Sequence, residues 1–200
     1  MIAIDSGSIE VRWTLIRNSN FSDRKKYQNW CRDRLKDASG LPDVEILYSP
    51  EGKPFLRGSS LAFSLSHSQS WTAFAFVPVS RQREGISLGI DVEDRMRKVD
   101  ALRIAQRFFH PSEVEVLTQM KGQPEELKDE FFRIWTRKES VVKCQGSALA
   151  RELSQLPPSD LLLESRRFTD HHWMSAAVRL PIGHQEMGQQ LRFRELVYLP

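Results

Sequence analysis

One stretch of the chain combines helical spacing with charges that could do chemistry. Residues 131–143 read FFRIWTRKESVVK, and their apolar residues recur every three or four positions, which is typical of an amphipathic helix. Trp135, Glu139 and Lys143 are four residues apart, so a helix places them along one side. An exposed Glu/Lys ion pair, worth roughly 0.2–0.5 kcal/mol, would explain the same charges. The helix alone therefore leaves a functional site and an ordinary surface pair both open.

A second stretch favours a functional site. Residues 88–93 read LGIDVE and predict a buried strand, whose three aliphatic side chains face one way while Gly89, Asp91 and Glu93 face the other. Two acids two residues apart, beside a glycine that leaves room, indicate half of a metal site. Glu139 on the predicted helix could complete it. We therefore expect these three carboxylates to converge on one divalent cation.

The elements that must position these residues predict a mixed α and β protein. We expect strands over residues 9–17, 44–48, 61–66, 71–79, 86–93, 161–168, 172–180 and 191–199, and helices over residues 23–38, 99–109 and 125–144. The last three strands are expected to be antiparallel. His110 stands before Pro111 and three residues before Glu113, which predicts the N-cap of a further helix rather than a catalytic histidine.

Length and composition are those of an ordinary globular protein. The 200 residues, 40% of them hydrophobic, suffice for one domain or two small lobes. With 29 basic and 26 acidic residues the net charge is only +3, and no basic tail of the kind that binds nucleic acid is visible. Cys31 and Cys144 are too few for a disulfide framework, and no signal peptide or bilayer-length apolar run is seen. We expect a cytoplasmic protein that binds neither nucleic acid nor membrane.

Two segments of the chain resemble one another. Residues 67–77 (HSQSWTAFAFV) and 170–180 (DHHWMSAAVRL) each place a histidine ahead of a Trp that opens an Ala-rich strand. A duplication would imply two lobes of similar design that meet at a cleft. We place their boundary in the polar, charged turn at residues 80–85, so that the lobes cover residues 1–82 and 83–200. His67, in a serine-rich turn, would suit a cleft where its ring meets an anion. A turn histidine without a role fits the same pattern.

Four motifs appear in the order and spacing of the 4′-phosphopantetheinyl transferases. They are SLSHS at 64–68, LGIDVE at 88–93, RFFHPSE at 107–113 and WTRKESVVK at 135–143. The combination of GID-x-E with W-[ST]-x-KES-x-x-K is the specific part, and the sequence most resembles the single-chain type typified by the surfactin-synthetase-activating enzyme. The resemblance implies an α+β fold of two lobes related by a pseudo-twofold, each a small antiparallel sheet packed with helices, with the active site at their junction.

The resemblance also implies a reaction. Family members use magnesium to move the phosphopantetheine arm of coenzyme A onto a serine of an acyl or peptidyl carrier protein, and they release 3′,5′-adenosine bisphosphate. Asp91, Glu93 and Glu139 match the expected magnesium ligands by residue type. Glu139 is also expected to take the serine proton, directly or through water, and Lys143 to hold the pyrophosphate or the departing phosphate.

The same resemblance assigns further contacts to coenzyme A. Arg24, Lys53, Ser66 and His67 are expected to contact it together with Asp91 and Lys143, and His67 is expected at the 3′-phosphate.

Fewer residues precede Arg24 than is usual in the family, and Arg17, Lys25 or Lys26 would have to supply the missing basic charge. We expect an active, monomeric transferase. A non-catalytic module that binds coenzyme A or carrier proteins is one alternative. A magnesium-dependent nuclease is another, but it should show a broader basic surface.

Overall fold

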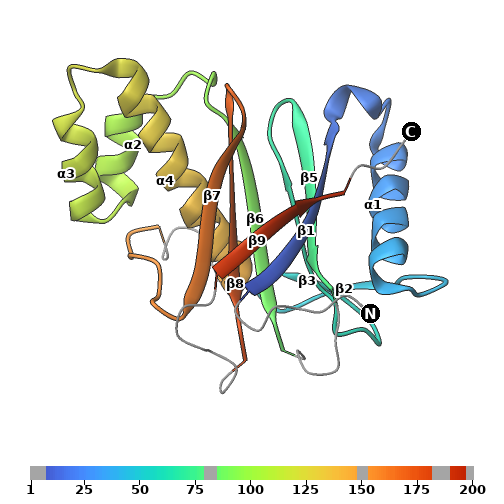
Figure 1. Ribbon diagram of the computed structural model, residues 1–200. Helices are drawn as coiled ribbons and strands as arrows, with labels where there is room; N and C mark the ends of the chain where they lie inside the picture. Colours follow the sequence, from blue (N-terminus) through green and yellow to red (C-terminus); the bar gives the residue numbers. More distant parts are fainter. Residues whose placement is uncertain (1–7, 79–84, 148–152, 182–189, 197–200) are drawn as a thin grey trace.

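The computed structural model describes residues 8–78, 85–147, 153–181 and 190–196 as a mixed α and β protein (Figure 1). Its elements, in chain order, are β1 (Ser8–Arg17), the 3-10 turn η1 (Asn18–Asn20), α1 (Arg24–Ser39), β2 (Ile46–Tyr48), β3 (Pro54–Leu56), β4 (Ala62–His67), β5 (Trp71–Val77), β6 (Ser87–Asp94), α2 (Ala101–Phe108), α3 (Pro111–Gln119), α4 (Pro124–Gln145), β7 (Leu161–Thr169), β8 (His172–Arg179) and β9 (Gln190–Glu195). Within the described residues, the predicted helices and strands are confirmed with shifts of one or two residues at their ends. The short strand β3, which pairs with β2, was not expected.

Two larger sheets pack face to face between layers of helices (Figure 1). One has the strand order β4-β5-β1-β9 and the other β6-β8-β7, and all their neighbouring strands are antiparallel except β1 and β9. The helix α1 covers the outer face of the first sheet. The helix α4 lies on the outer face of the second sheet, with α2 and α3 beyond it. The α+β fold class is therefore confirmed.

Strand alternation explains how the sheets form one core. In β5, Ala73 and Ala75 face the other sheet and contact the aliphatic side of β6, while Phe74 and Phe76 face α1 and pack around its buried Leu35. The aliphatic side of β6 is thereby buried on one face of the strand, as the sequence predicted. The opposite face of β6 is left for α4.

The prediction for the last strand was wrong. Residues 191–199 were expected to run antiparallel with the two preceding strands, but β9 instead pairs in parallel with β1, with Ile9 opposite Leu191. Alternating apolar residues predict which face of a strand is buried, and they do not identify the sheet edge to which it adds. Residues 197–200 lie outside the described part of the chain.

The predicted lobe boundary at residues 82 and 83 also lies outside the described residues. The two segments that resemble one another form β5 and β8, each an inner strand of its sheet. Ala75 of β5 and Ala176 of β8 belong to the same core cluster between the sheets. The internal resemblance thus corresponds to equivalent inner positions in two packed sheets.

The local prediction for His110 is confirmed. His110 caps α3, its Nδ1 accepting a bond from the backbone N–H of Ser112, and Glu113 accepts from the His110 backbone at 3.0 Å. Cys31 and Cys144 are both free and buried. Among the helices in the described ranges, none combines the length and the apolar character needed to cross a bilayer.

Candidate active site

The candidate site is built where β6 and α4 approach most closely, at Gly89. A Cβ atom on this residue would lie 2.0 Å from the carbonyl oxygen of Ser140 and 2.4 Å from the backbone nitrogen of Cys144. No side chain fits there, so glycine lets the backbones of strand and helix meet. The sequence suggested that this glycine leaves room beside a metal. The structure fills that room with the helix itself, which brings the acids of β6 next to the charged side of α4.

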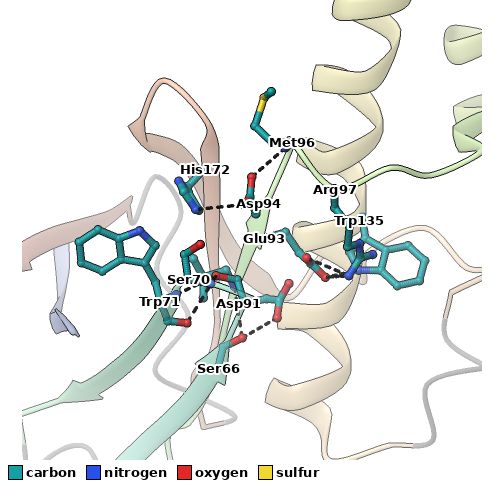
Figure 2. Close-up of polar contacts among 12 residues, drawn as sticks. Ser66, Ser70, Trp71, Asp91, Glu93, Asp94, Met96, Arg97, Trp135 and His172 are labelled. Atoms are coloured by element: carbon teal, nitrogen blue, oxygen red, sulfur yellow. Dashed lines mark hydrogen bonds and ion pairs between the residues drawn. The ribbon is translucent and has the colours of Figure 1, made fainter. Parts of the chain in front are cut away.

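Asp91, Ser66 and Lys143 form the centre of the site. The Lys143 ammonium lies 2.7 Å from Asp91 Oδ1, and it also donates to the Ser66 hydroxyl at 2.9 Å. Ser66 in turn donates to the same Oδ1 atom at 2.8 Å (Figure 2). Asp91 is only 4% exposed, and its Oδ2 atom is buried without a hydrogen-bond partner among the described residues. One carboxylate oxygen is therefore held twice and the other is left bare.

Two serines join the strand β4 to the edge of β6. The backbone N–H of Ile90 donates to the Ser64 hydroxyl at 3.0 Å, and that of Val92 donates to the Ser66 hydroxyl at 3.3 Å. Each hydroxyl accepts a hydrogen bond from a buried N–H group of β6 that would otherwise need a neighbouring strand as its partner. The site thus lies where β4 of one larger sheet contacts β6 of the other.

Glu93 lies next to Asp91 and is directed toward Arg97 and Trp135 (Figure 2). Its Oε1 atom accepts from Trp135 Nε1 at 3.1 Å, and its Oε2 atom lies 3.2 Å from the guanidinium of Arg97. Burial, and then the nearby Asp91 carboxylate, raise the pKa of Glu93 to about 7, while Arg97 and the Trp135 hydrogen bond oppose that rise. Glu93 can therefore gain or lose a proton near neutral pH.

Glu139 is half-buried and lies on α4 one turn before Lys143. Burial is the main cause that raises its pKa to about 7, the Asp91 carboxylate is the second, and Glu93 adds to it. Lys143 and Arg97 act in the opposite direction. The three predicted carboxylates are thus close enough to interact electrostatically. Within the described part of the chain, however, no three His, Cys, Asp or Glu side chains already enclose a common metal position.

The remaining predicted residues fall into two pockets. Arg24 and His67 line one pocket of about 330 Å³, where Phe21 and Tyr27 supply aromatic walls. The structure therefore brings together two of the residues that were expected to contact coenzyme A, and one of them, His67, was expected at its 3′-phosphate.

Lys53 lies elsewhere, on the wall of a pocket of about 260 Å³ that it shares with Lys143. The Lys53 ammonium donates to the carbonyl oxygen of Cys144 at 2.6 Å and to the Ser87 hydroxyl. Burial lowers the pKa of Lys53. Its charge is directed at the C-terminal end of α4, where the last carbonyl groups of the helix favour a cation.

Sequence reasoning missed two partners of the acids. Trp135 was expected on the same side of the helix as Glu139 and Lys143 but was given no polar partner, and its indole N–H is a donor to Glu93. The spacing of four residues between Trp135 and Glu139 was the available signal for it. Arg97 was assigned no role, and nothing in its sequence context marked it as the counter-charge of Glu93.

The comparison with known proteins identifies a family over the part of the chain that carries the acids and Lys143. A family profile described as the 4′-phosphopantetheinyl transferase superfamily matches residues 87–189, a range that contains β6 and α4. The chain is 39% identical over 113 residues to the 4′-phosphopantetheinyl transferase HetI of Nostoc sp., which is 54% of this chain and 44% of the relative. It is 32% identical over 157 residues to a 4′-phosphopantetheinyl transferase of Bacillus subtilis, covering 77% and 61%.

A third relative is the 4′-phosphopantetheinyl transferase gsp of Aneurinibacillus migulanus, 32% identical over 120 residues, which is 59% of this chain and 46% of the relative. The chain spans about half the length of the curated relatives it matches.

Proposed function

This chain belongs to the 4′-phosphopantetheinyl transferase superfamily, and we propose from that premise that it transfers the phosphopantetheine arm of coenzyme A to a serine of an acyl or peptidyl carrier protein. One observation carries the proposal. Asp91 of β6 lies 2.7 Å from Lys143 of α4. Glu93 and Glu139 both interact electrostatically with this pair. An acid cluster beside a lysine has the residue types that phosphoryl transfer from a pyrophosphate needs.

We further propose that Asp91, Glu93 and Glu139 hold a magnesium ion. The bare, buried Oδ2 atom of Asp91 supports this, because a buried carboxylate oxygen without a partner is costly. The raised pKa values of Glu93 and Glu139 also support it, since burial first and the neighbouring carboxylates second disfavour the ionised forms, and a bound cation would offset both effects. When bound, magnesium would offset the charge of the pyrophosphate and of the leaving group.

The roles of the other side chains follow from the bonds that change. The carrier serine oxygen bonds to the β-phosphorus of coenzyme A, the phosphorus–oxygen bond to the bridging oxygen breaks, and 3′,5′-adenosine bisphosphate leaves. Glu139 is the proposed acceptor of the serine proton, directly or through water, as a carboxylate at the edge of the proposed metal site. Lys143 is proposed to shift its hydrogen bond from Asp91 to the departing phosphate and stabilise its charge.

For the nucleotide end we propose the pocket that Arg24 and His67 share. A guanidinium and an imidazole suit phosphate oxygens, and the rings of Phe21 and Tyr27 suit a flat base. Lys53 is proposed to contribute positive charge to the second pocket, next to Lys143.

A single assay tests the proposal. The protein is incubated with coenzyme A, magnesium and an apo acyl carrier protein or an apo peptidyl carrier domain, and the carrier is then weighed by mass spectrometry. We expect the carrier to gain one phosphopantetheine, and the isosteric Asp91→Asn variant to give no gain. Binding of coenzyme A without a mass gain would support the non-catalytic alternative. Equal transfer by a folded Asp91→Asn protein would refute the assignment of the site.

A further inference from the structure

The hydrogen-bonding capacity of Ser66 is fully used inside the protein. A serine hydroxyl has one hydrogen to donate and two lone pairs that accept. Ser66 donates to Asp91 Oδ1 at 2.8 Å, and it accepts from Lys143 Nζ at 2.9 Å and from the backbone N–H of Val92 at 3.3 Å. The residue is only 4% exposed. Its hydroxyl therefore has no hydrogen left for a phosphate oxygen of coenzyme A.

We propose that Ser66 is instead a positioning residue for Asp91. It holds Oδ1 so that Oδ2 is the oxygen offered to a cation. This role rests on the metal site proposed above, and it differs from the contact with coenzyme A that the family resemblance implied.

The geometry explains why the carboxylate needs this contact. The terminal torsion of an aspartate is broad, so packing alone does not decide which oxygen points where. Ser66 and Lys143 come from different elements, β4 and α4, yet both bond to the same oxygen. Lys143 is also proposed to turn to the leaving phosphate during the reaction. Ser66 would then be the contact that keeps the orientation of Asp91 unchanged.

Ser64 provides a matched control within the same strand. It lies two residues before Ser66, it is also buried (6% exposed), and its hydroxyl likewise accepts a backbone N–H of β6, from Ile90 at 3.0 Å. Within the described part of the chain, its hydroxyl makes no hydrogen bond to any of the predicted acids. Removing either hydroxyl leaves one β6 donor without its partner, but only the loss at Ser66 also removes one of the two contacts that hold Asp91 Oδ1.

The test measures metal binding directly. Mn²⁺ is titrated into the full chain without coenzyme A, and free Mn²⁺ is followed by electron paramagnetic resonance. We expect Ser66→Ala to bind Mn²⁺ about 10- to 100-fold more weakly than the wild type, as is usual when a partner of a metal ligand is removed. Ser64→Ala is expected to bind it as the wild type does. Equal affinity of the Ser66→Ala and Ser64→Ala proteins would overturn the positioning role.

A second pair of variants covers the case in which Ser66→Ala fails to fold. Thr and Val have the same shape and differ in the hydroxyl, so Ser66→Thr should bind Mn²⁺ more tightly than Ser66→Val. Equal binding by this pair would refute the role.

Two further outcomes separate this inference from the proposed function. A wild type that binds Mn²⁺ more tightly than Ser66→Ala but transfers no phosphopantetheine would leave the positioning role standing and remove the activity. A wild type that binds Mn²⁺ no better than Asp91→Ala would remove the metal site and the positioning role together.

Discussion

Glu139→Gln should stabilise the folded protein at alkaline pH while abolishing transfer. The ionised carboxylate of Glu139 is half-buried and lies near Asp91 and Glu93, which raise its pKa together with burial. Glutamine keeps the shape of the side chain and removes the charge. The expected gain in stability would show that the free protein tolerates an unfavourable cluster of acids at the place where we propose a cation.

The size and sign of the effect follow from the two pKa values. The ordinary pKa of this group is 4.5, and in the folded protein it is about 7. Between these pH values the folded protein keeps a proton that the unfolded chain has released, so the free energy of unfolding falls as the pH rises through this window. The difference corresponds to about 3 kcal/mol above pH 7. Solvent around the half-buried side chain reduces it to about 1–3 kcal/mol.

Urea unfolding at pH 5 and pH 8, without metal, measures this directly. The stability of Glu139→Gln relative to the wild type should grow by about 1–3 kcal/mol from pH 5 to pH 8. Glu93 titrates over a similar range in the wild type and repels Glu139, so the measured difference between the two proteins includes the relief of that repulsion. Glu115→Gln on α3, where the side chain is exposed, is the control and should change with pH as the wild type does. The same difference at both pH values would refute the reasoning.

Three other predictions use the same contacts. Gly89→Ala should lower the free energy of unfolding by about 3 kcal/mol or more in urea, because its Cβ would lie 2.0 Å from a backbone oxygen of α4; stability equal to the wild type would contradict the close approach. The kcat/KM of transfer with magnesium should rise with pH and level off below about 7, because the proposed base Glu139 must lose its proton and the cation would lower its pKa from the metal-free value of about 7; a flat profile would speak against that role. Trp135→Phe should raise the pKa of Glu93 further, as NMR titration can measure, because the lost hydrogen bond lowers that pKa; a lowered value would contradict this.

The sequence alone determined which side chains face the candidate site. A strand alternates and a helix repeats every 3.6 residues, so LGIDVE had to send its acids away from its aliphatic side chains, and WTRKESVVK had to align its charges. Both periodicities are local properties of the backbone. For this reason the prediction of Asp91 and Lys143 on facing sides survives in the structure, where the two side chains touch.

Only the tertiary structure decided which residues complete the site and in what role. Ser66 lies 77 residues before Lys143 in the chain, and nothing in the local pattern of β4 indicated that its hydroxyl would join Lys143 to Asp91. The same holds for Lys53, whose ammonium is held by the end of α4, and for β9, which adds to the edge of β1. Contacts between distant segments depend on how whole faces pack, and the periodicity of one segment carries no information about its partner.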